Sequence, residues 1–289
     1  MDEHLRKEKR MYIGFNLQLN EDAGIFSDKV DYEMFKEKGE MHLTNQTKNL
    51  GKDLETYVKD DEIDGTKIQN ERFPLIEADV FISHSGKDDE LANALAGWLN
   101  ETFKLKCFID KNVWGYSKTL LEQMNSSLSD KRKNGNSGYL YNHESCNQVA
   151  QHVNMMLSVA LQKMIDRSET VIFLNTENAI KIHGEDCMEK TYSPWIYSEI
   201  ISTQLIRKKP LLEYRKSNLS FDVNESALIL EHSDIAYNVS LNHLMSLSED
   251  DLQRWSKRQK IRKYKYGLDA LYDFKCPEDL EKLRRYEII

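Results

Sequence analysis

The sequence has few cysteines and no long apolar run. Four cysteines occur among 289 residues, widely spaced and without a Cys-x-x-Cys pair: Cys107, Cys146, Cys187 and Cys276. This spacing predicts reduced thiols rather than a disulfide framework or a zinc site, and no histidine pair has the spacing of metal ligands. No apolar run approaches the roughly 18–20 residues that span a bilayer, and the charged first residues lack the apolar stretch of a secretory signal. These absences predict a cytoplasmic protein without a metal site.

The sequence also lacks several nucleotide-binding and catalytic motifs. No Gly-x-Gly-x-x-Gly, P-loop or Gly-x-Ser-x-Gly sequence is present, so dehydrogenase, ATPase and α/β-hydrolase functions are poorly supported. The net charge of -8 argues against nucleic-acid binding by the chain as a whole. One exception is the stretch 254–265, where seven of twelve residues are basic. It could hold an RNA backbone, an anionic partner or a nucleotide phosphate, but we favour the solvated face of a helix.

The pattern along the chain predicts an α/β domain that begins at Ala78. Residues 1–77 are charged and poor in aliphatic side chains, with a helix candidate at 44–59, and are interpreted as an N-terminal extension. Residues 78–85 are typical of a buried strand, 86–103 of an amphipathic helix and 106–114 of a second strand. A strand, a helix and a strand within some 30 residues predict a parallel β-α-β unit.

Further helices and strands follow, with one interruption. The pattern predicts a short helix at 116–124, a loop insertion at about 125–147, a helix at 149–166, a strand at 169–176 and a helix with Pro194 in its first turn. One or two last strands are expected within 227–240. A polar helical extension, 246–289, is expected to begin with a cap at Ser248. We therefore expect a flavodoxin-like open parallel sheet with helices on both faces over residues 78–245, plus helical extensions at both ends.

This arrangement places polar residues at one edge of the expected sheet. Ligands of such sheets bind at the carboxyl ends of the strands, so His84–Ser85, Asp110–Tyr116 and Asn175–Thr176 are expected on one rim. A second feature is the pair Trp195 and Glu199, which share a helix face one turn apart. A carboxylate beside an indole in a partly dry cleft suits binding of a ribose or a developing cation.

Three of these segments together resemble the TIR (Toll/interleukin-1 receptor) domain family. Residues 78–99, ADVFISHSGKDDELANALAGWL, resemble its first strand, loop and helix, and residues 107–116, CFIDKNVWGY, resemble its second strand and the following loop. Residues 193–200, SPWIYSEI, resemble the W-x-x-x-E segment in which NAD-cleaving members carry their catalytic glutamate. The resemblance covers roughly 160 residues, and the insertion at 125–147 and the long segment 176–193 depart from a compact TIR domain.

The resemblance implies a role for each matching position. Glu199 takes the place of the catalytic carboxylate, with Trp195 as the tryptophan of the motif. The remaining substrate contacts implied by the resemblance are Ser83, His84, Ser85, Asp110, Trp114 and Tyr116. For each of these a structural role, such as capping or packing, is the alternative interpretation.

The function implied is cleavage of the nicotinamide–ribose bond of NAD, which serves as substrate rather than as a resident cofactor. The product would be ADP-ribose or a cyclic isomer, in a bacterial antiphage system of the Thoeris kind whose partner effector senses it. The resemblance also implies self-association through TIR–TIR contacts. Two alternatives stay open: a non-catalytic TIR scaffold that assembles through residues 112–118, and a nucleoside-processing enzyme with a similar sheet.

Overall fold

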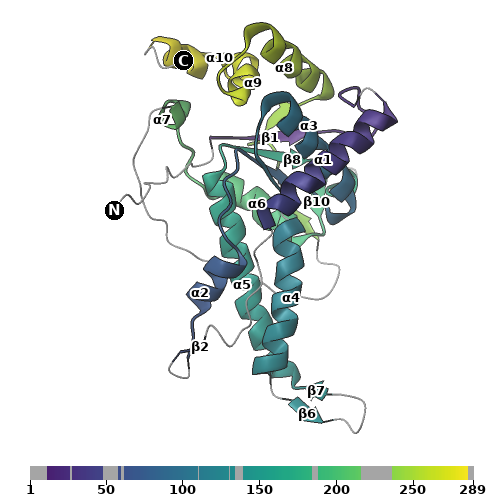
Figure 1. The fold of residues 1–289 in the computed structure, drawn as a ribbon, viewed down its shortest axis with the longest axis vertical. Helices are drawn as coiled ribbons and strands as arrows, with labels where there is room; N and C mark the ends of the chain where they lie inside the picture. The colour runs from purple at the N-terminus through teal and green to yellow at the C-terminus, as the bar shows by residue number, and fades with distance from the viewer. Residues whose placement is uncertain are drawn as a thin grey trace.

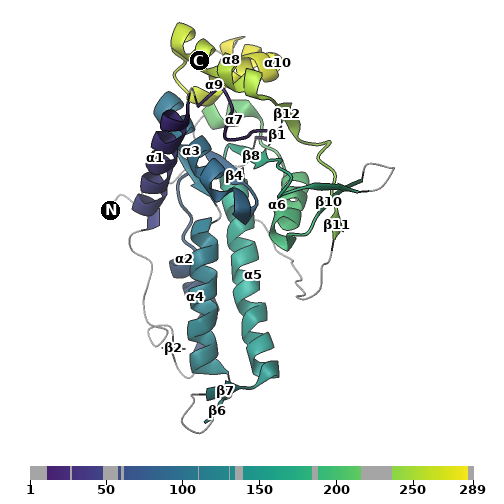
Figure 2. The same cartoon turned by 90° about the vertical axis from the view of Figure 1, so that its right-hand side faces the viewer.

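The central sheet consists of five parallel strands that come from distant parts of the chain. In the computed structural model they lie in the order β12, β1, β8, β4, β5 (Figures 1 and 2). Their bounds, in that order, are Met245–Leu247, Ile13–Leu17, Thr170–Leu174, Val80–Ser83 and Cys107–Ile109. The structure describes residues 12–26, 28–47, 58–59, 62–109, 111–129, 131–133, 139–183, 188–215 and 236–285. The expected α/β class with an open parallel sheet is confirmed.

Helices cover both faces of this sheet, and side chains alternate between the faces along each strand. Val80 and Ile82 of β4 belong to a core shared with α1 (Lys29–Thr47), α3 (Asp89–Phe103) and α8 (Glu249–Arg262). Phe81 faces the other way, toward α4 (Lys111–Leu128) and α5 (His143–Arg167). Phe173 of β8 packs on that second face beneath α6 (Pro194–Leu205). Burial on both faces explains why the strands are continuously apolar.

The N-terminal segment supplies a strand inside the sheet. Strand β1 pairs in parallel with β8 on one side and with β12 on the other. With β4 counted first, β5, β4 and β8 follow the flavodoxin order 2-1-3-4-5, and β1 takes the fourth position, which that order gives to a later strand. This pairing corrects the expectation that residues 1–77 form an extension ahead of Ala78. The apolar part of β1 is too short, among charged neighbours, to stand out as a buried strand.

Helix α1 follows β1 and packs tightly along α3. A Cβ atom added to Gly97 of α3 would lie 1.9 Å from the backbone oxygen of Phe35, and one added to Gly39 of α1 would lie 2.0 Å from that of Asn93. Real Cβ atoms do not come this close to other atoms. The backbones of the two helices are therefore in contact, and both glycines are required by that approach.

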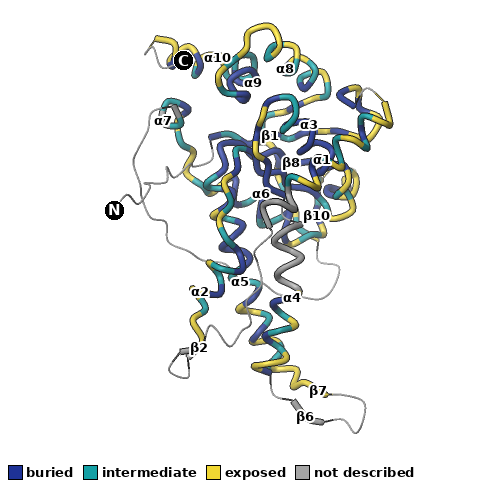
Figure 3. Tube along the Cα trace, viewed as in Figure 1, coloured by how far each residue is buried: buried dark blue, intermediate teal, exposed yellow. Residues whose placement is uncertain are grey.

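The second strand and the expected insertion differ from the sequence-based prediction. Strand β5 ends at Ile109, and α4 begins at Lys111 and continues to Leu128, so 111–114 are helical. Residues 125–147, expected as a loop, contain the end of α4, a two-stranded hairpin of β6 (Lys131–Lys133) and β7 (Tyr139–Tyr141), and the start of α5. Asn142 caps α5 by accepting hydrogen bonds from the backbone of Glu144 and Ser145. The polar composition of this segment fits the exposure of residues 126–128 and 139–144 at the far end of the helical hairpin (Figure 3).

The remaining elements are short or lie outside the sheet. They are β2 (Val58–Lys59), β3 (Glu62–Ile63), α2 (Gly65–Arg72), the 3-10 helix η2 (Gly86–Asp88), β9 (Lys181–His183), β10 (Met188–Thr191), α7 (Leu211–Arg215), β11 (Tyr237–Asn238), α9 (Gly267–Lys275) and α10 (Pro277–Arg285). Of the expected last strands in 227–240, residues 227–235 lie outside the described part, and β11 joins β10 and β9 in a separate sheet. The expected helix 44–59 also falls largely outside it. Residues 44–47 are helical and end α1, whereas 58–59 form β2 rather than a helix.

The C-terminal helices close the face that carries α1 and α3. The predicted cap at Ser248 is present as a capping box with Asp251 at the start of α8. Trp255 of α8 is fully buried and stacks on Phe103, with ring centroids 4.2 Å apart. Residues 249–285 are thus part of the same core. Among the described helices, none combines the length and the apolar character needed to cross a membrane.

Replacing Gly97 with alanine should destabilise the protein. Alanine favours a helix over glycine by about 1 kcal/mol. Its methyl group would push the α1 backbone away, and overpacking costs about 1–3 kcal/mol or more, with the upper end expected here because the obstacle is backbone. Urea denaturation should show this loss for Gly97→Ala. Gly86→Ala is the matched control, because nothing lies within 4 Å of the added Cβ. Equal stability of both variants would contradict the close contact.

Candidate functional site

Glu199 and Ser83 meet at the carboxyl end of β4. The Ser83 hydroxyl donates a hydrogen bond to Oε2 of Glu199 over 2.5 Å. Both residues are buried, with exposed fractions of 1% for Ser83 and 2% for Glu199. The sequence-based prediction named both positions, 116 residues apart in the chain. The fold therefore brings a buried carboxylate and a hydroxyl together at a strand end.

The local structure explains why these two side chains meet. Ser83 follows Phe81 at a spacing of two, so it faces the same side of the sheet, which α6 covers. Helix α6 begins where the Ser193 side chain accepts a hydrogen bond from the backbone of Ile196, with Pro194 in the first turn. Glu199 meets the end of β4, whereas Thr203, one turn later, contacts His243 just ahead of β12. The helix therefore runs antiparallel to the strands.

Trp195 lies one turn before Glu199 and shares its buried helix face. Its exposed fraction is 9%, and it packs in the core of the second face together with Phe81. The predicted common face of Trp195 and Glu199 is consistent with this burial. In the described structure Trp195 is a packing residue that fixes the position of α6 over β4.

A polar residue of β1 completes the row of side chains on this face. The register pairs Phe173 of β8 with Ser83 on one side and with Asn16 on the other. Phe15 and Leu17 belong to the opposite core, so Asn16 faces α6. Its Oδ1 atom is buried and accepts no hydrogen bond from a described residue. Sequence reasoning missed Asn16, because no local pattern shows that β1 lies beside β8.

His84 and Ser85 are directed away from the pair of Glu199 and Ser83. The Nε2 atom of His84 lies 2.9 Å from Oδ1 of Asp89, in the first turn of α3, and the ring is buried. The side chain of Ser85 accepts a hydrogen bond from the backbone of Lys87, which caps η2. Both contacts are structural, which agrees with the alternative interpretation of these two residues as capping or packing residues.

The other predicted contacts are placed only in part. Asp110 lies outside the described residues. Trp114 and Tyr116 lie on the first turns of α4, so they are on a helix rather than on the loop expected after the second strand. Their side chains fall outside the described part of the structure. Residues 112–118, the expected assembly loop, are likewise helical.

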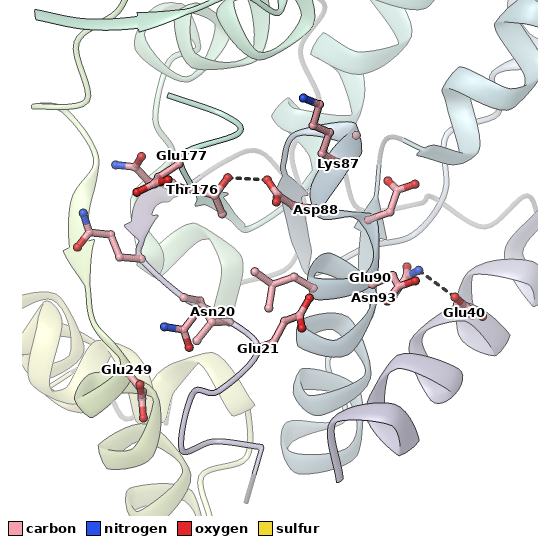
Figure 4. A pocket seen from close by; sticks show the side chains of 16 residues that line it. Asn20, Glu21, Glu40, Lys87, Asp88, Glu90, Asn93, Thr176, Glu177 and Glu249 are labelled. Carbon is pink, nitrogen blue, oxygen red and sulfur yellow. Dashed lines mark hydrogen bonds between the residues drawn. The ribbon is translucent and has the colours of Figure 1, made fainter. Parts of the chain in front are cut away.

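A crevice of about 900 Å³ opens at the carboxyl edge of the sheet, on the side of α1, α3 and α8 (Figure 4). It is lined by the segments that follow three strands: 18–21 after β1, 86–91 after β4 and 175–177 after β8. Thr176 and Asn178 donate hydrogen bonds of 2.5 and 2.6 Å to the two carboxylate oxygens of Asp88. These two hydrogen bonds connect the segments that follow β4 and β8. The expected rim therefore contains Asn175 and Thr176, but Glu199 and Ser83 do not line the crevice.

The crevice is strongly acidic. Seven carboxylate residues and a single lysine line it: Glu21, Glu40, Asp88, Asp89, Glu90, Glu177, Glu249 and Lys87. Two like unit charges 4 Å apart repel by about 4 kcal/mol at an effective dielectric constant of 20. A phosphate-bearing ligand is therefore disfavoured there. The sequence did not predict this acidic cluster, because its residues come from five separate segments.

The basic stretch 254–265 serves the packing of the C-terminal helices. Arg258 and Arg262 of α8 and Arg284 of α10 all form ion pairs with Asp273 of α9. Arg254 lies over the ring of Phe274, with its Cζ atom 4.7 Å from the centroid. These contacts support neither an RNA site nor a purely solvated face, since part of the basic side chains is used within the protein.

Comparison with known proteins identifies no relative: no family model, curated protein or solved structure matches the chain. Within the described residues, no group of three or more histidine, cysteine, aspartate or glutamate side chains is placed to hold a metal ion. The assignment of function therefore depends on the geometry of the site.

The hydrogen bond between Ser83 and Glu199 should appear as an energetic coupling. Ser83→Ala leaves a buried carboxylate without this donor and should destabilise the protein by about 1–3 kcal/mol. In Glu199→Leu the same serine change should matter less, giving a coupling of about 1.5–3 kcal/mol in a double-mutant cycle of urea unfolding. Ser202→Ala on the same helix is the control, because that hydroxyl bonds only its own helix backbone at Ser198. Additive effects of the Ser83 and Glu199 changes would contradict the contact.

Asp273→Asn should weaken the C-terminal helices in a pH-dependent way. Burial raises the pKa of Asp273, but the hydrogen bonds and the charges of Arg284, Arg258 and Arg262 outweigh it, so its pKa lies below the ordinary value. A lowered pKa contributes stability above the unfolded value of about 3.9, and this contribution is lost as pH falls through the folded pKa. The variant should lose about 1.5–3 kcal/mol near neutral pH, and this difference should begin to shrink near the unfolded pKa and disappear only as pH falls through the lowered folded pKa. Glu122→Gln, on the exposed side of α4, should change stability little at any pH; a pH-independent loss for Asp273→Asn would argue against the ion pairs.

Proposed function

We propose that this protein cleaves the nicotinamide–ribose bond of NAD, with Glu199 as the carboxylate that stabilises the reacting ribose. The observation that carries this proposal is the buried contact of Glu199 with Ser83 at the carboxyl end of β4. Strand ends of an open parallel sheet are where ligands of this fold class bind. The resemblance of 193–200 to the W-x-x-x-E segment of NAD-cleaving TIR domains supports the same residue.

The reaction requires little from the protein except a negative charge placed next to the ribose. Nicotinamide leaves as a neutral molecule, so no acid is needed to protonate it, and the electron pair of the broken C–N bond goes with it. The ribose becomes an oxocarbenium-like cation, which an ionised carboxylate stabilises where water is excluded. Attack by water then gives ADP-ribose with loss of one proton, and attack by a group of the same molecule gives a cyclic isomer.

The charge distribution favours one of the two faces of the sheet edge as the binding site for NAD. The carboxylates of the acidic crevice repel the two phosphates of NAD. Ser83, Glu199 and Asn16 lie on the opposite face, beneath α6. We propose that NAD binds at this α6 face of the sheet edge, where the amide oxygen of Asn16 can accept a hydrogen bond from a ribose hydroxyl. Ser83 is then a positioning residue that holds the glutamate in place.

A non-catalytic TIR-like scaffold is the second candidate. It is favoured by the burial of Glu199, whose exposed fraction is only 2%. In this alternative the carboxylate and Ser83 serve to fix α6 on the sheet. In the catalytic proposal, the edge beneath α6 opens when the protein assembles, and the product signals to a partner effector in antiphage defence.

Nicotinamide release should depend on Glu199. The purified protein would be incubated with NAD, alone and in lysate of phage-infected cells, and the products resolved by chromatography with mass detection. Glu199→Gln should lower release by at least about 100-fold, the usual effect of removing one stabilising group at a charged transition state. Glu278→Gln, at an exposed position in the first turn of α10 and away from both faces of the carboxyl edge, should retain activity.

The same experiment separates the candidates. The mass of the second product distinguishes hydrolysis from cyclisation. Release of nicotinamide that survives in Glu199→Gln would overturn the assignment of the carboxylate. Oligomers that never release nicotinamide under either condition would favour the scaffold, and turnover of nucleosides without turnover of NAD would favour a nucleoside-processing enzyme.

A further inference from the structure

One exposed surface of the protein combines basic and apolar residues at the end of a long projection. Helices α4 and α5 have 18 and 25 residues, so at 1.5 Å per residue they are about 27 and 37 Å long. They carry the β6–β7 hairpin to the end farthest from the sheet (Figures 1 and 2). The tip surface is defined here as Leu128, Arg132, Tyr139, Leu140 and Tyr141, all exposed.

The tip surface contains more large apolar side chains than is usual for a surface exposed to solvent. Tyr139, Leu140 and Tyr141 have exposed fractions of 57%, 60% and 42%. They pair with a strand whose sequence is Lys-Arg-Lys, in which Arg132 lies opposite Leu140. Tyrosine and arginine are enriched in protein interfaces, where they carry much of the binding energy.

The acidic crevice has the complementary character. Its volume of about 900 Å³ falls within the range of ligand sites. Glu21, after β1, and Glu177, after β8, are exposed and make no ion pair with a described residue. Asn93, with an exposed fraction of 2%, also lines the crevice, and its Oδ1 atom accepts no hydrogen bond from any described residue. The crevice thus offers open carboxylates and a buried acceptor to a donor-rich, cationic group.

We propose that the acidic crevice of one molecule receives the basic tip surface of a second copy of the same chain. The guanidinium of Arg132 is a cation with several donors, which suits the carboxylates of Glu21 and Glu177. Leu140, which lies opposite Arg132 on the same face of the hairpin, covers the apolar part of this contact, and the two tyrosines line the other face. The chain provides both partners, so no other molecule is needed to explain either surface. This proposal is independent of the reaction proposed for Glu199.

The geometry makes this contact intermolecular and head-to-tail. The tip lies at the opposite end of the α4–α5 hairpin from the crevice, so it cannot reach the crevice of its own molecule (Figures 1 and 2). Two different surfaces meet, so each added molecule leaves one free tip and one free crevice. Such heterologous contacts build rings or open filaments rather than closed dimers. The attraction is electrostatic in part and should weaken with salt.

Charge reversal on either side tests the contact with the full-length chain. The tip variant is Lys131→Glu with Arg132→Glu, and the crevice variant is Glu21→Lys with Glu177→Lys. The control is Lys257→Glu with Lys260→Glu, which makes the same charge change as the tip variant at two exposed lysines of α8. Sedimentation velocity at low salt measures the species formed over a range of concentrations, and thermal unfolding verifies that each variant is folded.

We expect the parent protein and the control to form larger species with increasing concentration. In each charge-reversed variant the dissociation constant of self-association should rise by at least about tenfold. That variant should therefore stay monomeric at concentrations where the parent protein assembles. An equimolar mixture of the two variants should recover assembly, because the intact tip of the crevice variant meets the intact crevice of the tip variant and the two reversed surfaces are also complementary. Combining both reversals in one chain should restore assembly with exchanged charges.

Several outcomes would overturn the proposal. A parent protein that stays monomeric at its highest soluble concentration would exclude the contact. Assembly that persists in the folded tip variant, or a variant mixture that forms no pair, would place the interface elsewhere. Loss of assembly in the control variant would show that net charge, rather than the tip, controls association.

Discussion

The alternation of side chains along β4 is the constraint on which the rest of the structure depends. The sheet is covered on both faces, so each residue of the strand must fit one of two separate cores. Val80 and Ile82 fill the core beneath α1, α3 and α8, and Phe81 fills the core beneath α4 and α5. Ser83 therefore falls on the second face, where it meets Glu199. A shift of the strand by one residue would exchange every one of these contacts.

This alternation also separates the two features of the carboxyl edge. One face presents Ser83, Glu199 and Asn16 beneath α6, in a buried setting. The other face opens into the acidic crevice, where Thr176 and Asn178 hold Asp88 and so join the loops after β4 and β8. The first setting suits a reaction that creates positive charge and needs exclusion of water. The second suits a cationic partner and disfavours the phosphates of a dinucleotide.

Local sequence patterns predicted the elements whose character is strongly periodic. The apolar run before Ser83, the amphipathic helices α3 and α5, and the cap at Ser248 each leave a signal within a few residues. The pairing of Trp195 with Glu199 could be predicted for the same reason, since a helix places positions four apart on one face.

What could not be predicted depends on pairing between distant segments. Strand β1 is recognisable only from its partners β8 and β12, and Asn16 acquires its position through them. The crevice joins residues from five parts of the chain, so none of its carboxylates stood out singly. The tight contact of α1 with α3 likewise depends on two glycines, Gly39 and Gly97, that are 58 residues apart (97 − 39) in the sequence.

The proposed NAD site is the face of the sheet edge that α6 covers. The most direct measurement is the binding of carba-NAD, in which a methylene group replaces the ring oxygen of the nicotinamide ribose so that the bond is not cleaved, followed by backbone amide NMR of the labelled protein. The largest shift changes are expected at Ser83, Trp195 and Glu199, with the amides of Glu21, Asn93 and Glu177 unchanged. Changes centred on the crevice, or no binding by the assembled protein, would contradict this site.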